Sequence, residues 1–465
     1  MKTKSGGRKN LLQQLFAMML ALVLAVADVP AAGLGGVFAL GTVHAEGTLT
    51  ITVPEKYASI PETKVTEPID TFEASAWVSG GAAPYTFEKV SGPDWIWVLE
   101  SGVVTGVPVK EAETNADLVI RVTDSEGESA TAAIPVGKNP PLWQQRISVT
   151  GNYSAMQTVD NVVVDTDHAF RIGTVVNVSG HMLGYDDDTA NYWGGGDPIF
   201  SHSSTPSFYW TNSNGVSGAG ESNYNAKFDW ERGTLTLRNY DGRGIAFGGP
   251  YTKEINDGVN GSYGNGILYL KGDNTVTVDN SETGSKNAVG IVTGRKGNLV
   301  ITGDDGATLT IRVKTERVEK DGDDYGNISG IHTGIDYNPG ANVEVCDKVG
   351  KVIVCGNVTV NIEVVSEEYL SEGFISGISA AEGVYVLQGA SLNVSAAADY
   401  PFSPGLVMAV YNSSAKKALT VATSGRVKLR AKNSDGANSP TNWTYATGPV
   451  QLYDANLLKA EWQSF

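Results

Sequence analysis

Gly290-Ile291, Asn298-Leu-Val-Ile-Thr-Gly303 and Thr308-Leu-Thr-Ile-Arg-Val313 are consecutive parts of one unit in a sequence repeat. The unit begins at a Gly-Ile dipeptide and continues as two short segments separated by a glycine-containing turn. The dipeptide recurs at intervals of 46, 40 and 47 residues, at Gly244-Ile245, Gly290-Ile291, Gly330-Ile331 and Gly377-Ile378. Self-similarity at such a period is typical of a fold built by stacking short units.

The segments of the repeat alternate between aliphatic and polar residues, as in Leu309/Ile311 and Val358/Val360, so each segment has one aliphatic face. A single pair of strands cannot bury enough apolar surface to be stable, whereas stacked coils cover one another. We therefore expect an all-β protein in which residues 233–465 form a parallel β-helix, a solenoid with inward aliphatic ladders. An antiparallel series of sandwiches is the alternative.

Residues 225–430 also carry a family resemblance. The matching segments are Phe228-Asp-Trp-Glu-Arg-Gly-Thr-Leu-Thr-Leu-Arg-Asn239, Ile267-Leu-Tyr-Leu-Lys-Gly-Asp-Asn-Thr-Val-Thr-Val278 and Asn298-Leu-Val-Ile-Thr-Gly-Asp-Asp-Gly-Ala-Thr-Leu-Thr-Ile311. They resemble bacterial surface β-helix modules related to polysaccharide-binding proteins of the pectate-lyase-like superfold. The resemblance implies a right-handed parallel β-helix that binds carbohydrate, in some members with calcium and usually without catalysis.

Residues 46–137 have a different pattern, with short predicted strands separated by turn residues. The predicted strands include Thr48 to Val53, Phe72 to Val78, Tyr85 to Val90, Leu118 to Val122 and Ala130 to Val136. Several short strands in about 90 residues favour a β-sandwich. We expect the rings of Trp95 and Trp97 to lie in its core.

Three segments of the same region resemble the Ig-like, dystroglycan-type cadherin-like modules of bacterial surface proteins. They are Gly80-Gly-Ala-Ala-Pro-Tyr-Thr-Phe87, Gly102-Val-Val-Thr-Gly-Val-Pro108 and Val119-Ile-Arg-Val-Thr-Asp-Ser-Glu-Gly127. The resemblance implies a spacer or an adhesion unit. Some cadherin-like relatives bind calcium, and Asp124 is the one candidate ligand here, although a lone Asp in a Ser-Glu-Gly turn is more often explained by turn chemistry.

The sequence also predicts an export signal before these regions and a linker between them. A basic start, the apolar run Leu15 to Ala27 and the small-residue end at Ala45 predict an export signal over residues 1–45. The run is shorter than the roughly 20 residues that span a bilayer, and an uncleaved anchor is the alternative. Two prolines predict a linker at 138–141, and residues 142–232 form a less regular β region that caps the solenoid.

The balance of charge limits the partners of the chain. It has 34 Lys and Arg against 51 Asp and Glu, a formal net charge of −17. So acidic a protein repels nucleic acid and anionic membrane surfaces, so membrane contact is expected only through an uncleaved signal. The expected location is extracellular or the cell surface.

The two cysteines and the acidic clusters are candidates for covalent and metal chemistry. Cys346 and Cys355 lie nine residues apart and could form one local disulfide in an oxidising compartment. Asp186, Asp187 and Asp188 supply the hard oxygen ligands that calcium prefers, with a solvated acidic loop as the alternative. No cofactor is expected, and calcium is the one alternative left open.

Loop aromatics are the candidate ligand-binding residues, because exposed rings offer sugars a flat apolar face. They are Tyr192, Trp193, Tyr209 and Trp210. The alternative is that these rings cap the open end of the solenoid core.

Asp304 and Asp305 are the candidate catalytic pair, because inverting glycosidases use two carboxyl groups roughly 6.5–9.5 Å apart. They occupy a position that recurs as a turn in neighbouring units, so we interpret them as a repeat corner. We therefore expect an exported, non-catalytic surface protein that binds extracellular carbohydrate. The alternatives are a polysaccharide lyase or glycoside hydrolase of the pectate-lyase-like fold, and a structural or adhesive stalk with a protein partner.

Overall fold

The structure is a computed structural model. It describes residues 47–110, 112, 116–139, 158–159, 162–163, 175–178, 181–183, 207–210, 221–229, 234–242, 244–248, 266–279, 288–293, 297–315, 325–333, 335–336, 344–345, 350–366, 372–380, 382–398, 406–411, 419–433, 444–446 and 450–453. The chain divides into two compact units, Met1–His44 and Ala45–Phe465, and the described residues belong to the second. The predicted export signal and Pro140-Pro141 of the predicted linker lie outside the described residues.

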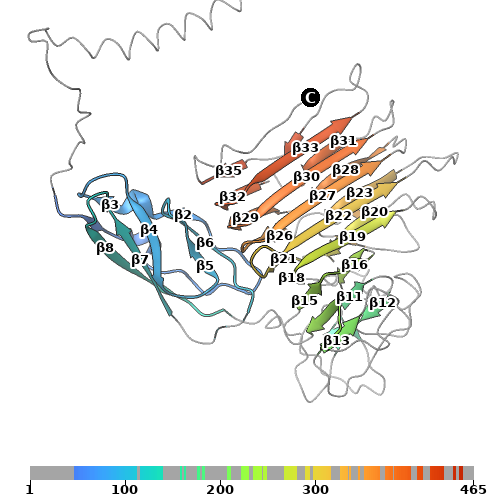
Figure 1. The fold of residues 1–465 in the computed structure, drawn as a ribbon, viewed down its shortest axis with the longest axis horizontal. Helices are drawn as coiled ribbons and strands as arrows, with labels where there is room; N and C mark the ends of the chain where they lie inside the picture. The colour runs from blue at the N-terminus through green and yellow to red at the C-terminus, as the bar shows by residue number, and fades with distance from the viewer. Residues whose placement is uncertain are drawn as a thin grey trace, which may run out of the picture. The chain divides into compact units, whose positions relative to one another are not determined.

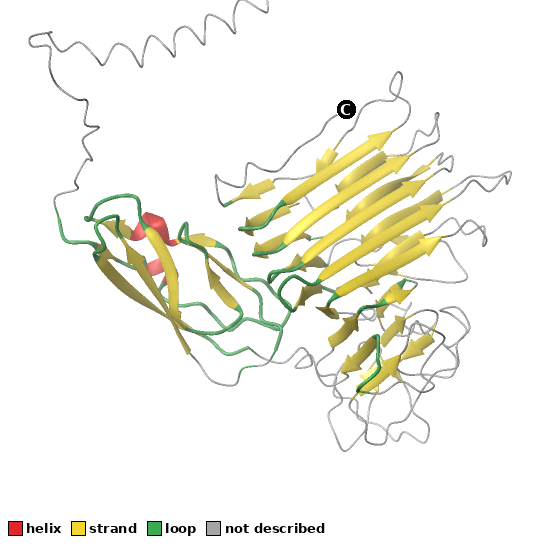
Figure 2. Ribbon diagram, viewed as in Figure 1, coloured by secondary structure: helices red, strands yellow, loops and turns green. Residues whose placement is uncertain are grey.

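Residues 47–139, called the N-terminal module below, are built from antiparallel strands and two short 3-10 helices (Figures 1 and 2). Their hydrogen-bonded groups are β1 (Thr50–Ile51) with β3 (Val78–Ser79); β2 (Phe72–Glu73), β6 (Val103–Gly106) and β5 (Ile96–Val98); and β4 (Thr86–Ser91), β7 (Ala116–Thr123) and β8 (Ser129–Val136). The helices are η1 (Glu55–Tyr57) and η2 (Ala74–Trp77).

One predicted strand of this module is wrong in its middle. Phe72 to Val78 was expected to be continuous, but η2 interrupts it and separates β2 from β3. The interruption places Trp77 in the core, where its ring stacks on Phe72 at a centroid distance of 5.2 Å. Aromatic burial at this point therefore overrides local strand propensity.

Most of the other described strands form a parallel β-solenoid of three sheets (Figure 1). The eight-stranded sheet has the order β12 (His181–Leu183), β11 (Val175–Val178), β17 (Ile245–Gly248), β20 (Ala288–Thr293), β23 (Tyr325–His332), β28 (Glu372–Ser379), β31 (Leu406–Tyr411) and β34 (Thr444–Ala446). The nine-stranded sheet has the order β13 (Ser207–Trp210), β14 (Ala226–Asp229), β15 (Thr234–Arg238), β18 (Gly266–Lys271), β21 (Leu299–Gly303), β26 (Lys351–Val354), β29 (Gly383–Gln388), β32 (Leu419–Thr423) and β35 (Val450–Leu452).

The six-stranded sheet has the order β16 (Asp241–Gly242), β19 (Asp273–Asp279), β22 (Thr308–Thr315), β27 (Thr359–Ser366), β30 (Ser391–Ala398) and β33 (Val427–Asn433). Pairing is parallel from β15, β16 and β17 onward, and antiparallel among β11 to β15 where the stack begins. Two small hairpins, β9 (Thr158–Val159) with β10 (Val162–Val163) and β24 (Ile335–Asp336) with β25 (Glu344–Val345), stand apart from the three sheets. The expected parallel solenoid is thus confirmed.

The Gly-Ile repeat lies in the eight-stranded sheet. Its isoleucines are register partners in successive coils, and each is at most 2% exposed. A Cβ on Gly330 would lie 2.2 Å from Ile362 Cγ2 and 2.7 Å from the carbonyl oxygen of Gly377. The glycines therefore leave room for core side chains of the six-stranded sheet, and Val410 pairs with Ile378 so that Ala409-Val410 continues the repeat.

The corner between the nine-stranded and six-stranded sheets also repeats. In five successive coils it contains a residue with φ between 47° and 83°: Asn239, Gly272, Gly306, Gly356 and Gln388. Such left-handed backbone favours glycine, and Asn tolerates it better than most residues. Asp304 and Asp305 belong to this corner, as their turn chemistry predicts.

Candidate functional site

The outward face of the six-stranded sheet, called the polar face below, carries the most regular display of polar side chains among the described residues. Strict alternation produces it: in β22, Leu309, Ile311 and Val313 are buried, while the residues between them point away from the core. The same alternation holds in β27 and β30. Because the strands pair in register, outward residues of neighbouring coils stand in rows.

Three rows cross the polar face. Their members are Asp273, Thr308, Thr359 and Ser391; then Thr275, Thr310, Asn361, Asn393 and Lys428; then Thr277, Arg312, Glu363, Ser395 and Arg430. Neighbouring members lie on adjacent strands, about 4.8 Å apart along the stack. The face therefore repeats hydroxyl and amide groups at a constant interval.

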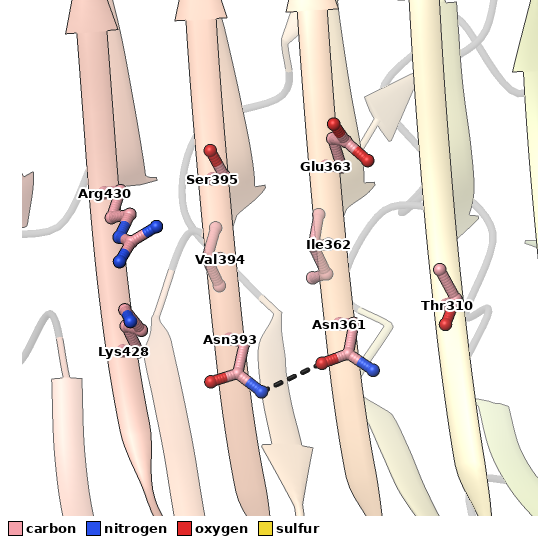
Figure 3. Close-up of a pocket in the computed structure, with 9 residues that line it drawn as sticks. All are labelled: Thr310, Asn361, Ile362, Glu363, Asn393, Val394, Ser395, Lys428 and Arg430. Atoms are coloured by element: carbon pink, nitrogen blue, oxygen red, sulfur yellow. Dashed lines mark hydrogen bonds between the residues drawn. The ribbon is translucent and has the colours of Figure 1, made fainter.

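A shallow depression of about 190 Å³ lies on this face between β22 and β33 (Figure 3). It is lined by Thr310, Asn361, Ile362, Glu363, Asn393, Val394, Ser395, Lys428 and Arg430. The side-chain amide of Asn393 donates to Asn361 Oδ1 at 2.9 Å, which holds the two amides in one orientation (Figure 3). This bond does not use the NH₂ group of Asn361 or the side-chain oxygen of Asn393, so both remain on the polar face as a donor and an acceptor.

Arg430 contributes a donor with an unusual environment. Its Nε is shielded from solvent and, within the described part of the chain, has no hydrogen-bond partner. A shielded donor without a partner costs free energy, which a ligand oxygen would recover. The depression can therefore supply amide, hydroxyl, ammonium and guanidinium contacts to a ligand rich in oxygen atoms.

The lining of the depression does not supply a pair of carboxylic acids. Glu363 is the only carboxylate among its nine residues. Asp304 and Asp305 lie at the corner instead, where Tyr269 Oη donates to Asp304 Oδ1 at 2.7 Å and Asn357 Nδ2 donates to Asp305 Oδ1 at 2.9 Å. The hydrogen bond to Asp304, with burial, raises the pKa of Tyr269 to about 12. These contacts assign the two aspartates to the corner that joins successive coils.

The sequence-predicted ligand residues lie elsewhere. Tyr192 and Trp193 fall outside the described residues, so their role stays a prediction. Tyr209 and Trp210 lie on β13, the edge strand at the start of the nine-stranded sheet, where their backbone pairs with Lys227 and Ala226. This backbone position is the one that a cap would occupy.

Of the predicted metal and disulfide residues, some lie outside the described residues and one is described. Asp186, Asp187, Asp188 and Cys346 lie outside the described residues. Cys355 is buried, and burial raises the pKa of its thiol to about 12. The disulfide and the calcium site therefore stay predictions.

Asp124, the other calcium candidate, is engaged in its turn. Its Oδ2 accepts the N–H of Ala82 at 2.9 Å, and its Oδ1 accepts those of Glu126 and Glu128 at 3.0 and 2.9 Å. These bonds hold the pKa of Asp124 below its ordinary value, the Ala82 bond most strongly. Both carboxylate oxygens thus stabilise the turn between β7 and β8.

Sequence reasoning directed attention to the loops and missed the polar face. The signal was present, because the residues between the aliphatic positions of 308–314, 359–363 and 391–395 are polar or charged at matching steps. Strand register was needed to show that these steps align.

Two features are absent from the described residues. No group of three or more His, Cys, Asp or Glu side chains is arranged to hold a metal ion there. Nor does any helix in that part of the chain have the length and apolar character needed to cross a membrane. Comparison with protein-family models, curated proteins and solved structures finds no match to this chain.

Proposed function

We propose that this chain is an exported, non-catalytic surface protein that binds an extracellular polysaccharide along the polar face. The observation that carries the proposal is the alignment of Thr310, Asn361, Asn393 and Lys428 in one row across successive coils. A polymer repeats its hydroxyl groups, so a surface that repeats donors and acceptors along one axis can bind several sugar units at once. Summed weak contacts of this kind give avidity without a deep pocket.

Within this proposal the amides of Asn361 and Asn393 bind sugar hydroxyls, and Arg430 donates to an exocyclic or ring oxygen. The solenoid is right-handed, as its resemblance to pectate-lyase-like modules implies, and the N-terminal module is an Ig-like, cadherin-like domain. The antiparallel sheets of that module and the basic-then-apolar N-terminus support these assignments. The single carboxylate of the depression favours binding over acid–base hydrolysis.

The test is a glycan array, with and without calcium, probed with the chain lacking residues 1–45. Binding to a polymer that is lost in the double variant Asn361→Ala/Asn393→Ala and kept in Thr131→Ala supports the proposal. Thr131 is an exposed residue of β8 and serves as the matched surface control.

Other results would redirect the assignment. Absence of binding to every polymer contradicts it. Unsaturated products or reducing ends from uronate polymers, abolished by Asp304→Ala, would establish the enzyme alternative. Recovery of a protein partner without sugar competition would establish the stalk.

A further inference from the structure

The outward face of the nine-stranded sheet is chemically unlike the polar face of the same coils. Its outward row contains Ile267, Val300 and Ile353, which are register partners and are each at most 1% exposed. The next partner in the row is Tyr385. In the equivalent strands of the six-stranded sheet the outward residues are polar or charged, among them Thr310, Asn361 and Glu363, so the nine-stranded sheet differs by this apolar outward row.

The N-terminal module supplies the cover. Val65, Val103 and Val107 of the module form one buried cluster with Ile267, Val300 and Ile353 of the solenoid. Partly buried residues from both sides complete that cluster, namely Trp97, Leu99, Val109, Tyr385 and Tyr453. Trp97 therefore belongs to this interface, whereas Trp95 lies in the module core as expected.

A polar anchor lies beside the apolar cluster. Asn298, which is 3% exposed, donates through Nδ2 to the Thr66 carbonyl and to Glu67 Oε1, both at 3.0 Å. Its Oδ1 accepts the backbone N–H of Lys351 at 2.9 Å. Every polar atom of the Asn298 side chain is thus used, two bonds being to the N-terminal module.

Ion pairs of Lys351 also connect the solenoid to the N-terminal module. Lys351 Nζ contacts Glu67 Oε2 and Glu382 Oε2, each at 2.8 Å. Burial alone would lower the pKa of Lys351, but Glu67 and Glu382 outweigh it and raise the pKa above its ordinary value. A cation between two carboxylates, partly shielded from water, is a directional contact that fixes orientation as well as contributing free energy.

The backbone of the module is shaped for this contact. Thr66 is 1% exposed and has φ of 71°, a conformation that β-branched residues rarely adopt. It follows Val65 of the apolar cluster and presents its carbonyl to Asn298. Strained backbone of this kind persists only where the surrounding structure over-determines it.

We propose that the apolar outward face of the nine-stranded sheet is a docking surface for the N-terminal module, and that the module is a non-covalently held side wall of the solenoid. The module therefore does not hang from the linker as an independent spacer. It stays bound when the linker is cut, and it shields a sheet face that would otherwise be an exposed apolar patch. This proposal does not depend on the polysaccharide assignment, because it concerns contacts within the chain.

The test places a site-specific protease sequence between Leu142 and Gly151 of the full chain and cleaves it under native conditions. We expect the two fragments to migrate as one species in size-exclusion chromatography. Separation of the fragments, or precipitation of the solenoid fragment alone, would overturn the proposal.

Two variants give the test a matched control. Val300→Asp places a charge on the docking surface, and Thr310→Asp places the same charge at an outward position of the polar face. Cleaved Val300→Asp should separate, whereas cleaved Thr310→Asp should stay together. The removal of Asn298 contacts in Asn298→Ala should speed fragment dissociation on the order of 10- to 100-fold, since buried partners are left unsatisfied.

Hydrogen–deuterium exchange of the uncleaved variants provides a second readout that does not require cleavage. The amides of residues 64–67 should exchange faster in Val300→Asp than in Thr310→Asp, with exchange in β22 and β27 unchanged by Val300→Asp. Equal exchange at 64–67 in the two variants would show that the module does not dock through this face.

Discussion

The side-chain amide of Asn298 donates a 3.0 Å hydrogen bond to the carbonyl oxygen of Thr66, joining residues 232 positions apart in the chain. Asn298 precedes β21 of the solenoid, and Thr66 belongs to a turn of the N-terminal module. The bond therefore links two regions whose sequence patterns are independent. Its partners are buried, so its loss has a measurable cost.

Asn298→Ala should lower the free energy of unfolding by about 1–3 kcal/mol, because the Thr66 carbonyl and the Lys351 N–H lose a buried partner. Asn393→Ala, on the polar face, should change stability by less than about 0.5 kcal/mol. Urea denaturation followed by tryptophan fluorescence measures both. Equal effects of the two variants would contradict the anchoring role of Asn298.

Gly330→Ala should destabilise the solenoid by about 1–3 kcal/mol, as overpacking of a well-packed core does. The added Cβ would meet Ile362 Cγ2 at 2.2 Å, inside the closest distance that side chains tolerate. A double-mutant cycle with Ile362→Ala should show favourable coupling, since that change removes the clashing atom. Ala409→Gly is the control, because Ala409 stands at the equivalent position of a later coil, where the structure already accommodates a Cβ. Additive effects of Gly330→Ala and Ile362→Ala would rule out the clash.

Gln388→Gly should raise stability by about 0.5–1 kcal/mol, because a left-handed backbone strains every residue with a Cβ. Gln388 has φ of 59° at the corner where three other coils have glycine and one has Asn239. The reverse change, Gly306→Ala, should cost about 1 kcal/mol, and it isolates backbone strain because no atom lies within 4 Å of the added Cβ. Thermal denaturation of both variants measures the two changes in stability. A destabilised Gln388→Gly protein would show that side-chain contacts of Gln388 outweigh the strain.

Asp124 should make the N-terminal module sensitive to acid. Its pKa is lowered in the folded state, so its stabilisation is complete above the unfolded value of about 3.9 and is lost as pH falls through the folded pKa. Asp124→Asn should therefore be less stable than the wild type at neutral pH, and the difference should shrink below pH of about 4. Denaturation of both proteins across a pH series measures this. If the stability difference between the wild type and Asp124→Asn stayed constant from neutral to acid pH, the ionised carboxylate of Asp124 would not be the source of the stabilisation.

Arg430→Ala should weaken binding of the polymer identified on the array by about tenfold or more, the loss typical of a hydrogen bond to a charged group. Arg312→Ala removes the same group from the same row but outside the depression, so it should have a smaller effect. Isothermal titration calorimetry compares the two variants. Equal losses would indicate general charge attraction in place of a defined contact, and no loss in either would exclude the depression as the site.

The prediction of the fold succeeded where local pattern and packing agree. Alternating segments such as 308–313 can bury one face only by stacking, and the Gly-Ile dipeptides mark a place where core side chains leave no room for a Cβ. Both constraints act within one coil and its neighbours. They are visible in a repeat without knowledge of the rest of the chain.

The polar face proposed as the site could not be predicted from the sequence, because it depends on which residues become neighbours. Asn361 and Asn393 are 32 residues apart, and only strand register brings their amides to 2.9 Å. The segments Leu299-Val-Ile301 and Val352-Ile-Val354 lack alternation, which is typical of strands buried on both faces. That signal indicated a covered sheet, but it could not say which part of the chain covers it.

The sequence by itself therefore determined a repeat of short strands that favours a stack of coils, because the period of its aliphatic residues and the positions of its glycines are local packing constraints, and strand pairing in the structure established that the stack is parallel. Only the tertiary structure decided the chemistry of the two outward faces. The hydrogen bond of Asn298 to Thr66, and the cluster that Val65 and Val300 share, join segments more than 230 residues apart, and no local pattern records such a pairing. The N-terminal module packs against apolar outward residues of the nine-stranded sheet, whereas the outward residues of the six-stranded sheet form polar rows, and this difference depends on long-range contacts and strand register.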